Sequence, residues 1–225
     1  MKLTYYGHSA LEIETAGKKL LFDPFISHNE LAKHIDINSL KPDYILLTHG
    51  HGDHMADFFA VQKNSGAKVI CIYEIMVWLD GKGVPGAHAM NIGGGYNFDF
   101  GRVKMVSAIH SSSMPDGSYG GNPAGYLLYL EGKKIYIAGD TALTYDMKLL
   151  ADENLDWAVL PIGDNFTMNA DDAVKAAGFV NCKNVIGVHY DTFPVIKIDK
   201  AEVAGKFKNA GLNLQLPGIG ESIEL

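Results

Sequence analysis

Four side chains that can bind metal ions stand close together in the segment Thr48-His49-Gly50-His51-Gly52-Asp53-His54. Imidazole nitrogens and carboxylate oxygens are the donors with which proteins hold Zn²⁺, Mn²⁺ and iron. His49 and His51 are two positions apart, so in an extended chain they point to the same side, whereas Asp53 and His54 point elsewhere. One ion can hardly contact all four side chains. The spacing therefore predicts two adjacent metal ions.

Two regular elements must hold this segment in place. Residues 44–48 form an apolar run that is typical of a buried strand, and residues 55–63 have the pattern of a helix. The metal-binding segment then forms a tight turn from strand to helix. Its two glycines let the backbone fold closely around an ion.

Three more potential ligands come at the ends of apolar strands. His110 follows a predicted strand over residues 102–109, Asp140 follows one over 134–138, and His189 follows one over 184–188. In open α/β folds, sites assemble outside the carboxyl ends of strands, so we expect these side chains at one edge. Asp140 can bridge two ions, because a carboxylate has two oxygens. The expected division is His49, His51 and His110 on one ion, Asp53, His54 and His189 on the other, and Asp140 on both.

Two other strand ends carry residues with two open interpretations. Asp23 ends the third predicted strand, over residues 19–23, and its carboxylate could orient a metal-binding histidine. The alternative is that Asp23 and Pro24 only form a strand-ending turn. His8 follows Gly7 at the end of the first predicted strand, and could face the site or only satisfy the turn.

Polar loops offer candidates for substrate contacts. Asp164, Asn165 and Thr167 lie between an apolar strand over residues 156–161 and a helix that Asn169 can cap. We expect them to contact substrate, and the alternative is a loop that only caps the helix. The loop 111–118 is a second candidate. Two divalent ions would leave the site net positive despite Asp53, Asp140 and a bridging hydroxide, which favours a small substrate with an anionic oxygen.

Composition limits the classes of protein to consider. With 225 residues, 47% of them hydrophobic and 20% charged, the chain is expected to form one soluble domain over residues 1–225. The net charge of −7 argues against a nucleic-acid partner. No apolar run is long enough to span a membrane, the N-terminal residues do not resemble a signal peptide, and two unrelated cysteines suit the cytoplasm. A homo-oligomer is compatible with the sequence.

The histidine-rich segment, combined with His110, Asp140 and His189 at strand ends, resembles the metallo-β-lactamase superfamily. That resemblance implies an α/β fold, a four-layer αβ/βα sandwich with a dimetal site along one edge. Further stretches resemble the compact metal-dependent hydrolase branch of bacteria and archaea, which is related to L-ascorbate-6-phosphate lactonase. These stretches are Gly7-His8-Ser9, Asp23-Pro24, Tyr119-Gly-Gly-Asn122, Gly139-Asp-Thr141 and Pro161-Ile-Gly-Asp164.

The chain also departs from some members of that superfamily. Asp140 stands where dinuclear zinc β-lactamases carry a cysteine ligand, so a β-lactam substrate is not expected. The chain shows neither the C-terminal helical region of glyoxalase II nor the basic insertion of RNase Z. Asp191 stands where close relatives are expected to carry glycine, which adds an acid near the site.

The function expected from these residues is hydrolysis of an ester, lactone or phosphoester. A hydroxide between two divalent ions (Zn, Mn or Fe) would attack the carbonyl or phosphorus, and the ions would stabilise the oxyanion. Asp53 and Asp140 are the predicted catalytic residues, and Asp53 could also accept the hydroxide's proton. The alternatives are a di-iron oxidoreductase on the same scaffold, which would need a flavin module or a pocket for a thiol substrate, and a non-catalytic metal-binding protein, which a missing ligand would indicate.

Overall fold

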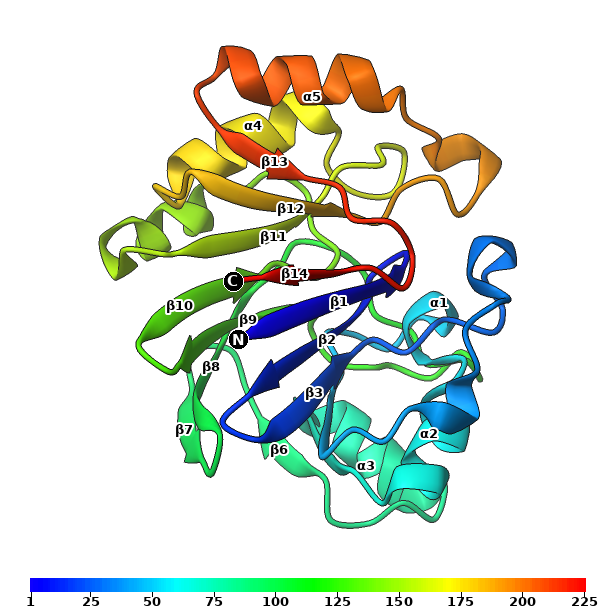
Figure 1. Ribbon diagram of the computed structural model, residues 1–225. Helices are drawn as coiled ribbons and strands as arrows, with labels where there is room; N and C mark the ends of the chain where they lie inside the picture. The colour runs from blue at the N-terminus through cyan, green and yellow to red at the C-terminus, as the bar shows by residue number, and fades with distance from the viewer.

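Two seven-stranded β-sheets lie face to face in the computed structural model, which describes residues 1–225 (Figure 1). The strands of the first sheet, in spatial order, are β14 (Ser222–Glu224), β1 (Lys2–Gly7), β2 (Ala10–Thr15), β3 (Lys18–Phe22), β4 (Tyr44–Leu46), β5 (Lys68–Ile72) and β6 (His88–Met90). Those of the second are β13 (Asn213–Gln215), β12 (Asn184–Val188), β11 (Trp157–Pro161), β10 (Lys133–Ile137), β9 (Ala124–Leu130), β8 (Gly101–Ser107) and β7 (Gly95–Phe98).

Helices cover the outer side of each sheet, which gives four layers and confirms the αβ/βα sandwich expected from the resemblance (Figure 1). The helices beside the first sheet are α1 (Gly52–Met55), α2 (Phe58–Ser65) and α3 (Tyr73–Gly81), and those beside the second are α4 (Ala170–Phe179) and α5 (Lys200–Asn209). Short 3₁₀ helices are η1 (Glu30–Ala32), η2 (Ile37–Ser39), η3 (Tyr145–Glu153) and η4 (Pro194–Ile196).

The central strands of the second sheet are buried on both faces, which explains their continuous apolar sequences. Successive residues of a strand point to opposite faces. Accordingly, Tyr126 and Leu128 of β9 pack in the large core that includes residues of both sheets, whereas Leu127 packs in the second core with residues of α4 and α5. Val159 and Leu160 of β11 divide between the two cores in the same way.

Strand direction determines where the potential metal ligands lie. In the first sheet, β1 and β3 both pair antiparallel with β2, and β4 is parallel to β3, so β1, β3 and β4 run the same way. The same reasoning makes β8, β10 and β12 run together in the second sheet. The residues that follow the carboxyl ends of these six strands include His8, Asp23, His49, His110, Asp140 and His189.

Some predicted elements differ from those of the structure. The helix expected over residues 55–63 is interrupted between α1 and α2, where Asp57 accepts hydrogen bonds from the backbone N–H groups of Ile26 and Ser27 at 2.6 and 2.8 Å. The helix expected from residue 143 to residue 152 is the 3₁₀ helix η3. Residues His88–Met90 form the short edge strand β6. Residues 213–225, for which one or two strands are expected, do form two, β13 in one sheet and β14 in the other.

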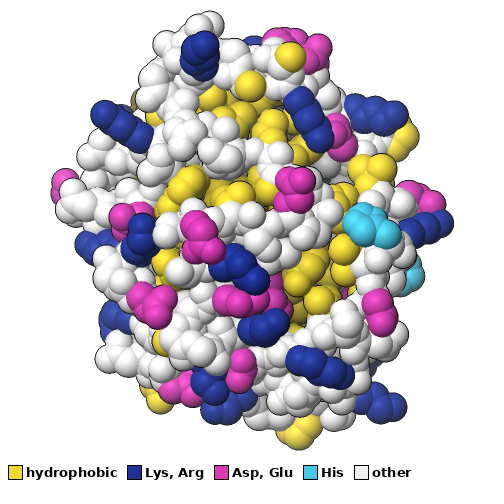
Figure 2. Space-filling model, in the orientation of Figure 1, with side chains coloured by type: hydrophobic (Ala, Val, Ile, Leu, Met, Phe, Trp, Pro, Cys, Tyr) yellow, Lys and Arg dark blue, Asp and Glu magenta, His cyan; other side chains and the backbone are white.

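The surface seen in Figure 2 carries acidic and basic side chains interspersed, with apolar side chains in the hollows between them. None of the helices has both the length and the apolar character needed to cross a membrane.

Candidate metal centre

All seven predicted metal ligands lie in one cluster, and His8 joins them. Within this cluster, three groups of residues have donor atoms that all lie within 4.8 Å of one another. These groups are His49, His51 and His110; His49, His54 and Asp140; and His8, Asp53, His54 and His189. The two groups that the sequence assigned to separate ions are thus both present, and Asp140 lies with donors from each of them.

The first group consists of histidines alone. Nε2 of His49 lies 3.0 Å from Nδ1 of His51, and the ring of His110 stands nearly perpendicular to both rings at centroid distances of 5.2 and 5.1 Å. Two imidazole nitrogens bound to one tetrahedral zinc ion are expected about 3.3 Å apart, given Zn–N bonds of about 2.0–2.1 Å. The facing nitrogens of His49 and His51 therefore fit a shared ion.

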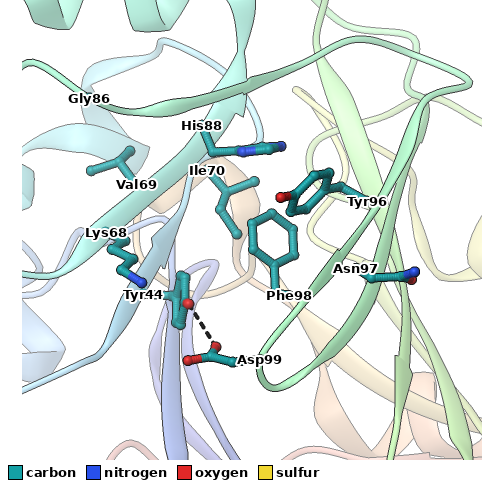
Figure 3. A pocket seen from close by; sticks show the side chains of 10 residues that line it. All are labelled: Tyr44, Lys68, Val69, Ile70, Gly86, His88, Tyr96, Asn97, Phe98 and Asp99. Atoms are coloured by element: carbon teal, nitrogen blue, oxygen red, sulfur yellow. Dashed lines mark hydrogen bonds between the residues drawn. The ribbon is translucent and has the colours of Figure 1, made fainter.

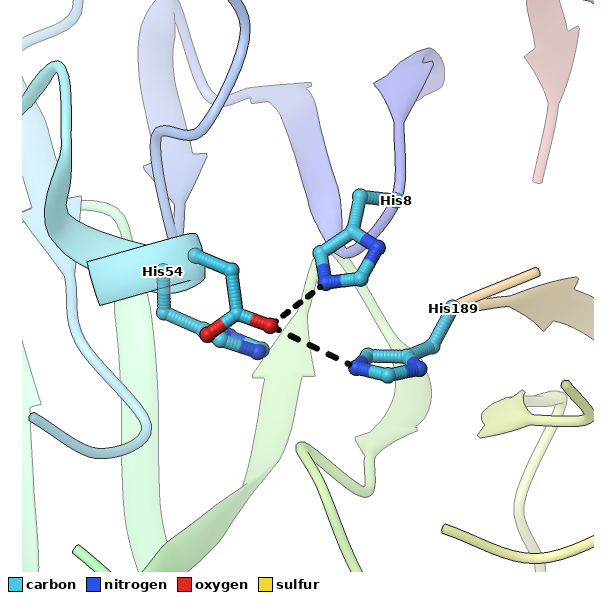
Figure 4. Close-up of side chains that lie close together, drawn as sticks. His8, His54 and His189 are labelled. Atoms are coloured by element: carbon cyan, nitrogen blue, oxygen red, sulfur yellow. Dashed lines mark hydrogen bonds and ion pairs between the residues drawn. The ribbon is translucent and has the colours of Figure 1, made fainter. Parts of the chain in front are cut away.

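The second group surrounds the carboxylate of Asp53. Its Oδ2 lies 3.1 Å from Nε2 of His8 and 4.0 Å from Nε2 of His189. The rings of His8, His54 and His189 converge on the same region from three different segments (Figure 4). The side chain of Asp53 is 29% exposed, whereas those of the three histidines are buried. Asp53 is thus the member of this group that solvent reaches.

Asp140 occupies the centre of the cluster. Its Oδ2 lies 3.0 Å from Nε2 of His189, 3.4 Å from Nε2 of His54 and 3.6 Å from Nε2 of His110. Donors of both groups therefore surround one carboxylate, which is the placement that a bridging ligand requires.

Several donor atoms of the cluster are buried without a hydrogen-bond partner. These atoms are Nε2 of His54, both ring nitrogens of His189 and Oδ1 of Asp140. Leaving a buried polar group unpaired costs about 1–3 kcal/mol, so such groups are rare in folded proteins. Divalent metal ions would supply partners for the Nε2 atoms of His54 and His189, which lie 3.4 and 3.0 Å from Asp140, but not for Nδ1 of His189, which points away from them. The mixed nitrogen and oxygen donors, without thiolate, suit Zn²⁺, Mn²⁺ or iron.

Burial and mutual charge set the protonation of these groups. Burial, together with the nearby His189, lowers the pKa of His8 to about 4, and burial lowers the pKa of His49 well below its usual value. Burial by itself would raise the pKa of Asp140, but His54 and His189 outweigh it and hold that pKa well below the usual range. Burial would lower the pKa of His54, but Asp140 and Asp23 outweigh it and raise that pKa well above its usual value. Neutral imidazoles and an ionised carboxylate are the forms that bind metal, so a metal ion would displace a proton from His54.

Asp23 fixes the orientation of a predicted ligand. Its Oδ2 lies 2.9 Å from Nδ1 of His54 and also accepts the hydroxyl hydrogen bond of Thr48 at 2.6 Å, while its Oδ1 accepts the backbone N–H of Thr48 at 2.8 Å. A carboxylate on Nδ1 turns Nε2 of His54 toward Asp140. Of the two interpretations of Asp23, the geometry supports the orienting one.

His8 differs from the other histidines of its group because both of its ring nitrogens have partners. Nε2 contacts Asp53, and Nδ1 lies 3.0 Å from the hydroxyl oxygen of Thr192. Its backbone adopts φ = 55°, in the left-handed region that few non-glycine residues adopt. This arrangement supports a role in holding Asp53 rather than direct metal binding. Sequence reasoning missed Thr192, a loop residue with no recognisable signal.

A cavity of about 460 Å³ opens beside the cluster. Its lining residues are His51, Asp53, His110, Ser111, Asp140, Phe166, His189, Phe193 and Val195. Ser111 comes from the loop 111–118 that the sequence singled out, and its hydroxyl lies 3.3 Å from Nε2 of His51. The apolar residues Phe166, Phe193 and Val195 were not predicted, because nothing in the sequence distinguishes them from other loop residues.

Of the residues 164–167, Phe166 lines this cavity and Asp164, Asn165 and Thr167 do not, so their contact with substrate stays a prediction. Asp164 and Asn165 are exposed and have φ values of 66° and 55°, and the buried hydroxyl of Thr167 has no hydrogen-bond partner. In this tight turn the N–H of Phe166 donates to the carbonyl of Asp164, and adjacent side chains diverge. Phe166 is the residue that reaches the cavity.

A different cavity, of about 360 Å³, lies between the edge strands β6 and β7 (Figure 3). Its lining includes Tyr44, Tyr96 and Phe98, and the ring of His88 packs 4.3 Å from that of Tyr96 and 4.9 Å from that of Phe98 between centroids. His88 belongs to none of the potential metal-binding groups.

Comparison with known proteins also points to a metal-dependent enzyme family. Residues 18–190 match the beta-lactamase superfamily domain. The chain belongs to this superfamily. A UPF0173 metal-dependent hydrolase of Flavobacterium johnsoniae is 54% identical, and one of Christiangramia forsetii is 53% identical, each over the full length of both chains.

Among solved structures of the superfamily, Igni18, described as a novel metallo hydrolase from the hyperthermophilic archaeon Ignicoccus hospitalis, is 34% identical to this chain. The match covers 99% of this chain and 97% of that one, with a TM-score of 0.89. The resemblance to the metallo-β-lactamase superfamily and its sandwich fold is therefore confirmed.

Proposed function

We propose that the protein is a dinuclear metal-dependent hydrolase that acts on an ester, lactone or phosphoester bond in a small molecule. The observation that carries the proposal is the arrangement of six donor residues in two groups around a seventh, Asp140, with buried donor atoms that lack partners. The names of the full-length relatives support metal-dependent hydrolysis. The lactone is included because of the sequence resemblance to the lactonase branch.

Each donor has a place in this proposal. His49, His51 and His110 would hold one ion, Asp53, His54 and His189 the other, and Asp140 both. When bound, two divalent ions supply an activated water nucleophile at neutral pH and electrostatic stabilisation of the developing oxyanion. Zn²⁺, Mn²⁺ and iron all fit the donors.

Three carboxylates of the protein have separate roles at this centre. Both Asp140 and Asp53 line the cavity, but Asp140 is buried between the two groups of histidines, whereas Asp53 is partly exposed. Oδ2 of Asp53 contacts His8, and no hydrogen bond within the protein uses its Oδ1. Oδ1 is therefore open to a metal ion or to water, and although burial would raise the pKa of Asp53, its contacts with His8 and His54 hold that pKa well below the usual range and keep the carboxylate ionised. Asp23 keeps Nε2 of His54 directed inward.

No observation favours the two alternatives. The cavity contains no cysteine or other group that suggests a redox substrate, and none of the seven expected ligands is missing from the cluster. A di-iron oxidoreductase and a non-catalytic metal-binding protein are therefore not proposed.

The test combines metal analysis with a substrate panel. Protein purified without chelator, and protein reloaded with Zn²⁺ or Mn²⁺, would be assayed on activated esters, lactones and bis-p-nitrophenyl phosphate. We expect hydrolysis that chelator abolishes and metal restores. Two bound ions without hydrolysis of any compound in the panel would contradict the hydrolase proposal. Hydrolysis that is unaffected by chelator would contradict its metal dependence.

A further inference from the structure

The cavity beside the metal centre has two chemically different sides. One side consists of the metal-binding side chains and Ser111, and the other consists of Phe166, Phe193 and Val195. No lysine or arginine lines it. Any positive charge available to a substrate therefore comes from the metal ions alone.

The apolar side chains of this cavity are exposed to solvent, which is energetically unfavourable. Phe166 is 52% exposed and Val195 is 57% exposed. Phe193 is half-buried and packs against Phe25 at 6.2 Å and His8 at 5.5 Å between ring centroids. Exposed apolar side chains that gather beside a site are typical of ligand-binding surfaces. Two separate loops supply them, one between β11 and α4 and one that contains η4.

The chemistry of this wall selects among substrates. A second carboxylate or phosphate on the substrate would lie against apolar side chains, lose water and find no cation to pair with. An aryl or alkyl group in the same place would gain from leaving water. The volume of about 460 Å³ falls within the range of about 300–1,000 Å³ that is usual for small-molecule sites.

We infer that the substrate carries an apolar aryl or alkyl group next to the hydrolysable bond and no second charged group. This inference rests on the proposed hydrolase function and narrows it. The anionic oxygen expected from the charge of the site is then confined to the end that faces the metal ions. Phe166, Phe193 and Val195 are the residues that set this specificity.

The experiment compares substrates of matched length with the metal-loaded full-length protein. Trifluoroethyl esters keep the leaving group small, and proton release reports hydrolysis. We expect kcat/KM for the valerate ester to exceed that for the acetate ester by about tenfold or more, because three additional methylenes are buried. The trifluoroethyl monoester of glutarate has an acyl chain as long as that of valerate but ends in a carboxylate. Its kcat/KM should be no higher than that of the acetate ester.

Variants locate the effect. Phe166→Ala and Val195→Ala should raise KM for the valerate ester severalfold more than for the acetate ester, with two ions still bound. Val195→Lys should shift the preference toward the glutarate monoester. Leu149→Ala is the matched control, because Leu149 is an apolar residue of η3 that is 80% exposed and does not line this cavity. Leu149→Ala should change neither the preference for the valerate ester over the acetate ester nor that over the glutarate monoester.

Calorimetry of valerate and glutarate binding gives a readout that needs no turnover. We expect valerate to bind more tightly, with a negative heat-capacity change that Phe166→Ala reduces. Hydrolysis with equal or better use of glutarate, or wall variants that behave like Leu149→Ala, would overturn the inference while leaving the hydrolase proposal intact. Tighter binding of valerate without hydrolysis would support the apolar site and contradict the hydrolase proposal.

Discussion

The ring of His8 joins two segments that are far apart in the sequence: its Nε2 lies 3.1 Å from Oδ2 of Asp53, and its Nδ1 lies 3.0 Å from the hydroxyl oxygen of Thr192. The backbone N–H of His189 also donates to the carbonyl oxygen of His8 at 2.7 Å. Asp53 and His189 are proposed ligands of the same ion. His8 therefore positions both of them, Asp53 through its side chain and His189 through its backbone.

Replacing His8 should therefore weaken binding of one metal ion more than the other. Groups that orient metal ligands typically contribute about 10- to 100-fold to metal affinity. We expect His8→Ala to lose this much affinity at one site, measured by competition with a chromogenic chelator, and Thr192→Val to lose less. His34→Ala, on an exposed histidine, serves as the control. Equal affinity in His8→Ala and the control would exclude the holding role.

Removing the carboxylate of Asp23 should disturb the centre from the opposite side. Asp23→Asn replaces the charged acceptor that lies 2.9 Å from Nδ1 of His54 with a neutral amide. We expect weaker metal binding and a lower melting temperature of the metal-loaded protein, because the side chain of Asp23 also holds Thr48 through two hydrogen bonds. A variant with unchanged metal affinity would show that Asp23 only forms the turn before Pro24.

Asp140→Ala should lose one or both ions and all metal-dependent hydrolysis. The carboxylate of Asp140 lies beside histidines of both groups, so its removal affects the ligands of both proposed ions. The fold should survive in far-ultraviolet circular dichroism, because the replaced group is a donor at the sheet edge and not part of either hydrophobic core. Retention of both ions with full turnover would show that Asp140 is not a bridge.

Two glycines of the metal-binding segment provide a steric test with a built-in control. A Cβ added at Gly50 would lie 2.5 Å from Sδ of Met114 and 3.2 Å from the carbonyl oxygen of Ser113, whereas one added at Gly52 would meet no atom within 4 Å. Gly50→Ala should destabilise the protein by about 1–3 kcal/mol, as overpacking does, and displace the loop beside His110. Gly52→Ala should leave stability and metal content near those of the parent. Identical denaturation curves for the two variants would contradict this packing.

The clustering of the candidate metal ligands could be predicted from the sequence because each of them has a local signal. His110, Asp140 and His189 follow apolar runs, and strands that run in one direction deliver their carboxyl ends to one edge. The sequence could not distinguish the two interpretations of Asp23 or His8, because the deciding partners, His54 and Thr192, are distant in the chain.

Features that depend on tertiary contacts were predicted poorly. The pattern over residues 55–63 predicts a continuous helix, but hydrogen bonds from Ile26 and Ser27 to Asp57 interrupt it. The polar turn after β11 predicted substrate contacts by Asp164, and nothing in its composition indicated that Phe166 would be the residue of this turn that lines the cavity. Polar composition alone does not show which side chain of a tight turn faces a site.

Anomalous diffraction from crystals of the zinc-loaded protein tests the central claim most directly. We predict two peaks about 3.5–4 Å apart, the usual separation in two-metal sites. One should lie within bonding distance of His49, His51 and His110, the other within bonding distance of Asp53, His54 and His189, and Asp140 should contact both. A single peak after saturation with Zn²⁺, or peaks away from these side chains, would contradict the dinuclear centre.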